Sequence, residues 1–221
     1  RVLRAGFVPQ EIEHRDPEVN HLSSVLRPLT DGDPAETAIV TEPSGAGKTC
    51  ISQFVTERLR EEALDIEATY INCWRNYTRF RTLYQLLDDI GRTIDIHRQS
   101  TPHDELIDRL QQYDGNRTVV ILDEADQLED TSVIYDLHSL PQFAVICITN
   151  EEEDLFGRVD DRLVSRLRAS EHVRMDKYAD EQLFDILSAR VRCGLEEDVI
   201  TDKQLYSVAD SAAGDARLAI G

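Results

Sequence analysis

Short apolar segments and amphipathic segments follow one another along most of this sequence. The apolar segments have the length and composition of buried strands, and the amphipathic ones repeat apolar residues at helical spacing. Strands are predicted at 37–41, 68–73, 118–122 and 143–149, and helices at 16–29, 49–63, 79–90 and 101–113. This alternation predicts an α/β fold, with a parallel sheet flanked by helices on both faces.

Two of the predicted helices begin with capping signals. Asp16 precedes Pro17 and is expected to cap the first helix. Thr101, followed three residues later by Asp104, resembles a capping box. Between the first helix and the first strand, residues 30–36 are predicted to form a polar loop.

The pattern changes after about Met175, where only helices are predicted. They open at Asp180, Thr201 and Gly214, and the given sequence ends inside the third. We therefore expect two domains, an α/β domain at 1–175 and an incomplete helical domain at 176–221.

A glycine-rich turn links the first predicted strand to the next helix. In such a turn, successive backbone N–H groups point at a phosphate chain, and the following helix adds its positive N-terminus. Lysine at its end is expected to contact the outer phosphates, and the threonine hydroxyl to bind Mg²⁺. The predicted nucleotide-binding residues are Pro43, Ser44, Gly45, Ala46, Gly47, Lys48 and Thr49.

Glu42 departs from this motif, which has glycine six residues before the lysine. A carboxylate facing a polyphosphate at an effective dielectric near 20 costs on the order of a few kcal/mol. One outcome is a side chain turned to solvent, with ATP binding weakened but present, and the other is a site that no longer binds. We favour the first, because the other motif residues are intact.

Polar residues end two further predicted strands. Asp123 and Glu124 follow the strand at 118–122, and Asn150 follows the strand at 143–149. Ligands of parallel α/β sheets bind beyond the C-terminal strand ends, so these side chains are expected near the phosphates. Asp123 is predicted to hold Mg²⁺ and Glu124 to orient the attacking water. For Asn150, a catalytic contact and a simple turn are equally favoured.

Arginines supply further candidates. Arg162, Arg166 and Arg217 could contact a γ-phosphate, although spacing alone favours ordinary surface arginines. Basic and aromatic residues alternate at 74–81, beginning with Trp74. One interpretation is a nucleic-acid or partner contact, and the favoured one is aromatic packing into the core.

The composition is strongly acidic. The formal net charge is −19, and the chain has 43 Asp and Glu against 24 Lys and Arg. We interpret this as adaptation to a salt-rich cytosol, where screening tolerates such charge. No run of about 18 apolar residues occurs, so no membrane span is predicted and a cytoplasmic location is expected. The chain starts with Arg1 rather than Met, and we expect a piece of a longer protein.

The ordered motifs resemble those of AAA+ ATPases, and finer features are similar to the archaeal origin-recognition initiators. These are relatives of the eukaryotic origin recognition complex and its cell-division-control loader. The composition favours a haloarchaeal member. The finer features are Phe7-Val8-Pro9, His14-Arg15-Asp16, Tyr70-Ile71-Asn72-Cys73, Leu122-Asp123-Glu124-Ala125-Asp126 and Gly214-Asp215-Ala216-Arg217.

The resemblance implies roles for individual positions. It makes Asn150 the first sensor, Arg217 the second sensor and Arg166, within the segment 162–166, the preferred trans-acting arginine. Val8 and Pro9, with His14 and Arg15, are expected to border the adenine pocket. The remaining assignments are Lys48 and Thr49 for Walker A and Asp123 and Glu124 for Walker B.

The resemblance also implies a function. An ATP-bound initiator, using ATP/ADP and Mg²⁺, binds origin DNA and switches state by slow hydrolysis. Origin DNA is held mainly by a C-terminal winged helix, which lies outside the given sequence. Two alternatives stay open: a non-hydrolysing scaffold that assembles with an intact paralogue, and another AAA+ ATPase such as a transposition helper.

Overall fold

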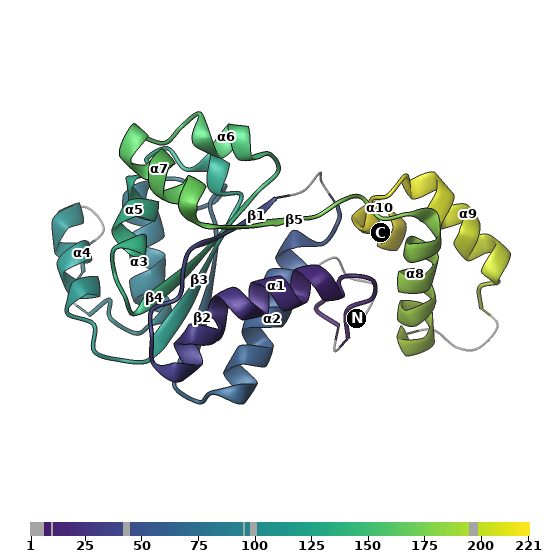
Figure 1. Cartoon of the computed structure of the whole chain (residues 1–221), viewed down its shortest axis with the longest axis horizontal. Helices are drawn as coiled ribbons and strands as arrows, with labels where there is room; N and C mark the ends of the chain where they lie inside the picture. Colours follow the sequence, from purple (N-terminus) through teal and green to yellow (C-terminus); the bar gives the residue numbers. More distant parts are fainter. Residues whose placement is uncertain (1–6, 10, 42–44, 95, 98–100, 195–198) are drawn as a thin grey trace.

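The structure is a computed structural model, and it describes residues 7–9, 11–41, 45–94, 96–97, 101–194 and 199–221. In this part of the chain, parallel strands form one sheet in the order β2-β3-β4-β1-β5 (Figure 1). The strands are β1 (Ala38–Thr41), β2 (Ile66–Asn72), β3 (Arg117–Asp123), β4 (Phe143–Thr149) and β5 (Glu171–Arg174). The predicted parallel α/β sheet is thus confirmed.

Side chains of the central strands alternate between two hydrophobic cores. Val119 and Ile121 of β3 face α1 (Asp16–Leu26) and α2 (Lys48–Glu62). Val120 and Leu122 face a second core, built with α3 (Arg79–Asp89), α4 (His103–Gln111), α5 (Ser132–His138) and α7 (Asp161–Ala169). Because both faces are covered, β3 and β4 are continuous apolar runs. Figure 1 shows these helices on opposite sides of the sheet.

A third hydrophobic cluster joins the C-terminal helices α8 (Asp180–Gly194), α9 (Asp202–Ala212) and α10 (Ala216–Ile220). Leu183 and Leu205 are buried in it, and Ala46 of the glycine-rich loop packs into it. The helices stand beside the C-terminal end of the sheet, at the far end of the molecule from α4 (Figure 1). Their core is therefore completed by a residue more than a hundred positions earlier in the chain.

Several local predictions are corrected by the structure. The N-cap of α1 is Arg15 rather than Asp16, and Pro17 lies in the first turn. The capping box at Thr101 is wrong, because Pro102 is the N-cap of α4 and the Thr101 hydroxyl accepts instead from the His97 N–H at 3.0 Å. The predicted polar loop begins as a 3₁₀ helix, η1 (Arg27–Asp31).

The remaining short elements had no sequence prediction. The edge strand β5 is four residues long and polar at all positions but Val173, which is its only buried residue. The elements η2 (Ala125–Gln127), α5, α6 (Glu152–Phe156) and α7 have nine residues or fewer. At these lengths the apolar repeat is too brief to specify a helix.

Candidate functional site

The first cluster of the site joins the glycine-rich loop to the end of β4. Because β1 and β4 are neighbours with Thr41 opposite Thr149, their C-terminal ends meet at one edge of the sheet. Lys48 is 9% exposed, and its Nζ donates to Oδ1 of Asn150 at 2.9 Å. The structure therefore brings together two predicted residues that lie 102 positions apart.

The second cluster surrounds the buried carboxylate of Asp123 at the end of β3. Its Oδ2 accepts from the Thr49 hydroxyl at 2.9 Å and from the Tyr70 hydroxyl at 2.6 Å. Burial raises the pKa of Tyr70, and the bond to Asp123 raises it further, so this hydroxyl stays protonated near neutral pH. Thr49 and Asp123 were both predicted from the sequence as magnesium-binding residues, whereas Tyr70 had no predicted role.

Glu124 follows Asp123, and its backbone has a left-handed conformation that glycine adopts more readily. Its φ is +58° and its ψ +47°, which for a side-chain-bearing residue is a sparsely populated, strained conformation. The Nδ2 of Asn72, at the end of β2, donates to its Oε2 at 3.2 Å. The turn thus holds an exposed carboxylate beside the loop, with its orientation set by Asn72.

The glycine-rich loop also contacts the C-terminal helices. The Gly45 carbonyl accepts from the Ala216 N–H at 3.0 Å. Gly45 has φ +91°, and a Cβ there would clash with the carboxylate of Asp215. Asp215 also caps α10, since its side chain accepts from the Arg217 N–H. The close approach of the loop to α10 therefore requires glycine at position 45.

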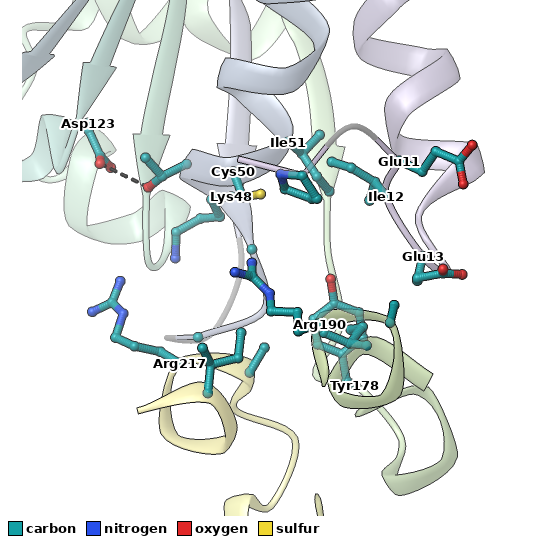
Figure 2. Close-up of a pocket in the computed structure, with 18 of the residues that line it drawn as sticks. Glu11, Ile12, Glu13, Lys48, Cys50, Ile51, Asp123, Tyr178, Arg190 and Arg217 are labelled. Carbon is teal, nitrogen blue, oxygen red and sulfur yellow. Dashed lines mark hydrogen bonds between the residues drawn. The ribbon is translucent and has the colours of Figure 1, made fainter. Parts of the chain in front are cut away.

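The loop, the strand ends and the C-terminal helices enclose a cavity of about 240 Å³. Figure 2 shows Lys48, Arg190 and Arg217 extending into it from α2, α8 and α10, with Glu11 and Glu13 on the side away from Lys48 and Arg217. Apolar and polar groups both line it: Pro9, Ile12, Gly45, Gly47, Lys48, Thr49, Cys50, Ile51, Asp123, Glu124, Asn150, Tyr178, Ile186, Ala189, Arg190, Ala216, Arg217 and Ile220, besides the two glutamates. Such a cavity suits an anionic ligand with an apolar end.

Other predicted site residues lie away from the cavity lining. Val8 packs against the core of α1 and α2, and Ala46 is buried among the C-terminal helices. Arg162 and Arg166 are exposed on α7, and the Arg166 guanidinium lies 4.5 Å from the centre of the Tyr135 ring. Glu42, Pro43 and Ser44 lie outside the described residues.

His14 and Arg15 contact the C-terminal half of the chain rather than the cavity. The His14 Nε2 pairs with Asp185 of α8 at 2.7 Å. Arg15 is 5% exposed, and it donates to the carbonyls of Ala46 at 3.3 Å and Asp176 at 2.5 Å. These contacts tie the start of α1 to the loop and to the segment leading into α8.

The cavity residues of α8, above all Arg190, were not predicted from the sequence. Its Nη2 donates to the Phe7 carbonyl at 3.3 Å, and its guanidinium lies 5.2 Å from the Phe7 ring centre. No short motif marks this arginine, because its place depends on how α8 docks. For Tyr70 and Asn72 a signal was present: they are two positions apart on β2, so both point to one face at the strand end.

The basic and aromatic segment at 74–81 is only partly buried. Trp74 is 66% and Tyr77 42% exposed, so the favoured prediction of core packing is wrong for both. It is right for Phe80, which packs against the core of α3. Arg81 lies 5.3 Å from the Tyr77 ring centre, and Arg79 pairs with Asp136 at 2.8 Å.

None of the helices in the described ranges is long and apolar enough to cross a membrane.

A parallel sheet whose first strand leads through a glycine-rich loop into a helix is the architecture of P-loop proteins. The sequence profile of the AAA domain family matches residues 33–159. Two curated relatives are ORC1-type DNA replication proteins of Halobacterium salinarum. Number 9 is 81% identical over the whole chain, which spans 62% of its length. Number 1 is 54% identical, and the chain spans 72% of its length.

Solved structures share the fold of this chain. Cdc6p from Pyrobaculum aerophilum superposes with a TM-score of 0.87 at 21% identity, over 99% of this chain and 62% of that one. The Aeropyrum pernix ORC1 protein, solved in complex with DNA, gives 0.81 at 25% identity, over 99% and 60%. The chain belongs to the AAA domain family and, within it, to the ORC1-type DNA replication proteins. The resemblance predicted from its motifs is confirmed, and its relatives fit a haloarchaeal source.

Proposed function

We propose that this chain is the ATP-binding part of a DNA replication initiator and that the cavity holds ATP. The observation that carries the proposal is the pairing of Lys48 with Asn150 and of Thr49 with Asp123 at 2.9 Å each. Each bond joins two residues that can bind a polyphosphate or its metal ion. The four residues lie near the C-terminal ends of β1, β3 and β4. The relatives' names support the replication role and favour it over a transposition helper.

The cavity groups suit the parts of a nucleoside triphosphate. Pro9, Ile12 and Ile186 offer apolar contacts to a base, whereas Lys48 and Arg217 offer charge to phosphates. The Aeropyrum pernix ORC2 protein was solved as complexes with ADPNP and ADP, which supports a nucleotide as ligand.

Thr49 and Asp123 fit a magnesium site. Their oxygens lie 2.9 Å apart at the foot of the cavity, and Mg²⁺ is commonly bound by one or two protein oxygens plus water and phosphate. When bound, Mg²⁺ would neutralise charge on the phosphates. Among the described residues, no group of three His, Cys, Asp or Glu forms a metal site of another kind.

Glu124 is proposed to orient and polarise a water molecule, with Asn150 beside it and Arg217 reaching in from α10. This assigns slow ATP hydrolysis to the site. Residues 176–221 are proposed to act as a lid, because α8 and α10 supply one wall of the cavity. Arg166, exposed on α7, is proposed to act on a neighbouring copy or paralogue.

Calorimetric titration with Mg·ATP in molar KCl tests nucleotide binding. Wild type should bind in the micromolar range or tighter, and Lys48→Ala should lower the affinity about tenfold or more, since a charge-assisted bond is lost. Lys203→Ala, an exposed lysine on α9, is the matched control and should bind as wild type. Absence of binding by wild type would refute the proposal.

Steady-state hydrolysis separates the initiator from the scaffold alternative. Glu124→Gln should abolish phosphate release while keeping ATP affinity. If wild type and Glu124→Gln both release phosphate only at the background rate, the result would favour a non-hydrolysing scaffold.

The exposed segment at 74–81 supports a DNA contact by this chain, besides any made by a winged helix. Trp74 and Tyr77 offer stacking surfaces, and Arg75 and Arg81 are exposed beside them. Trp74 is the single tryptophan of the sequence, so its fluorescence reports on this surface. Duplex DNA should quench it, and Arg75→Ala should weaken the quenching. Unchanged fluorescence under saturating DNA would exclude the contact.

A further inference from the structure

One interaction near the cavity without an assigned role is the hydrogen bond from Tyr70 to Asp123. At 2.6 Å it is shorter than the 2.9 Å bond from Thr49 to the same oxygen, Oδ2. The Asp123 residue is 7% exposed. A carboxylate in such surroundings is held by its hydrogen-bond donors, and two donors on one oxygen restrict its rotation.

The sheet explains how Tyr70 reaches this carboxylate. Asn72 lies opposite Asp123, and Tyr70 lies opposite Ile121 in the parallel register of β2 and β3. Residues two apart on a strand share a face, so Tyr70 and Asp123 project from the same side of the sheet. Ile121 on that face packs toward α1 and α2, and α2 also carries Thr49. Because β2 is an edge strand, a long side chain is needed to reach inward from it.

Tyrosine has the length and the polar end that this position requires. Its ring spans the distance from the edge strand and leaves the residue 40% exposed, while the hydroxyl reaches the buried carboxylate. In the described part of the chain, the Thr49 and Tyr70 hydroxyls both donate to Oδ2 of the carboxylate. With Oδ2 held in this way, the other oxygen, Oδ1, would be the one to accept from water bound to a metal ion.

We propose that Tyr70 is a positioning residue that holds Asp123 in the orientation needed for Mg²⁺ binding with the nucleotide. Tyr70 acts through Asp123 and does not itself touch the ion. The inference rests on the proposed function, since it concerns the metal that accompanies ATP. Hydrogen-bond partners of metal-binding carboxylates commonly contribute about 10–100-fold to metal affinity.

The test uses Tyr70→Phe, which keeps the ring and removes only the hydroxyl. A fluorescent ATP analogue is titrated in EDTA and then at increasing Mg²⁺, at constant KCl. In EDTA, Tyr70→Phe should bind the analogue as wild type does. The Mg²⁺ concentration for half-maximal enhancement of binding should rise about 10–100-fold. A merely structural role would change the affinity in EDTA as well.

Two further variants sharpen the result. Tyr206→Phe removes a hydroxyl on α9, where the ring stacks on Phe184 at 4.0 Å between centroids, and should leave both affinities unchanged. In an Asp123→Asn background, Tyr70→Phe should add nothing, because the carboxylate it holds is gone.

The outcomes separate the two proposals. If wild type shows Mg²⁺-dependent binding and Tyr70→Phe has the same Mg²⁺ requirement, the role of Tyr70 is refuted and the proposed function stands. An equal loss of affinity in EDTA and in Mg²⁺ also overturns it. If wild type binds no nucleotide under any condition, the proposed function fails, and the inference fails with it.

Discussion

Arg15 should contribute more to stability than any exposed arginine of the chain, and Arg15→Met tests this. The guanidinium is buried at the start of α1 and pairs with Glu18 at 2.9 Å. It also donates to the carbonyls of Ala46 and Asp176 and lies 4.1 Å from the Tyr178 ring centre. Methionine retains apolar volume but removes all these contacts with the guanidinium.

The expected loss follows from those contacts. Leaving a buried polar group unsatisfied costs about 1–3 kcal/mol, and a cation–π contact adds about 0.5–2 kcal/mol. Because the contributions are coupled, we expect a total of about 2–4 kcal/mol. At about 2–4 °C per kcal/mol for a chain of this size, the unfolding midpoint should fall by roughly 4–16 °C.

Thermal unfolding, followed by circular dichroism at about 0.2 M and at about 1 M KCl, measures the effect. Arg60→Met is the matched control, because Arg60 forms an exposed pair with Glu57 on α2 and such pairs contribute about 0–1 kcal/mol. Salt should leave the Arg15 effect largely intact, since buried contacts are screened less than exposed ones. A midpoint for Arg15→Met within the range of Arg60→Met would refute the reasoning.

Three other changes should have defined results. Gly45→Ala should lower both the unfolding midpoint and ATP affinity, because φ is +91° and the new Cβ would meet Asp215; calorimetry showing wild-type values for both would contradict this. Burial, and then repulsion by Arg166, lowers the pKa of His138, so the unfolded chain binds the proton more readily and stability should fall as pH drops below about 6.5. His138→Gln should flatten that part of the profile in chemical denaturation, and an unchanged slope would disprove the assignment. Glu42→Gly should tighten ATP binding in calorimetry, on the sequence argument of charge repulsion, and unchanged affinity would remove that argument.

The parts predicted from sequence were those specified by neighbouring residues. The strand Phe143–Thr149 was predicted to the residue, because seven consecutive buried positions leave an uninterrupted apolar run. Strand β5 escaped prediction, since its pairing with β1 compensates for a polar sequence. Its existence depends on a partner more than 130 positions away.

The same holds for the site: residues in short motifs were predicted, and residues placed by tertiary packing were not. Lys48, Thr49, Asp123 and Glu124 lie in motifs whose spacing expresses their chemistry, and the structure places all four at one cavity. Arg190 of α8 and Tyr178, which precedes α8, line that cavity only because of how α8 and the segment before it pack. Trp74 was expected to be buried from its residue type, but the position of its loop, beyond the end of β2, leaves it in solvent.

The packing of Ala46 among the C-terminal helices links the local opening of those helices to the loop. If α8–α10 unfold transiently, Ala46 loses its apolar surroundings and the Gly45 carbonyl loses the Ala216 donor. A ligand that holds the loop therefore raises the free energy of this opening. Amide hydrogens of Leu183 and Leu205 should then exchange more slowly with solvent when the loop is occupied, although neither residue lines the cavity. Hydrogen exchange in α9 thus reports, at a distance, on what the glycine-rich loop has bound.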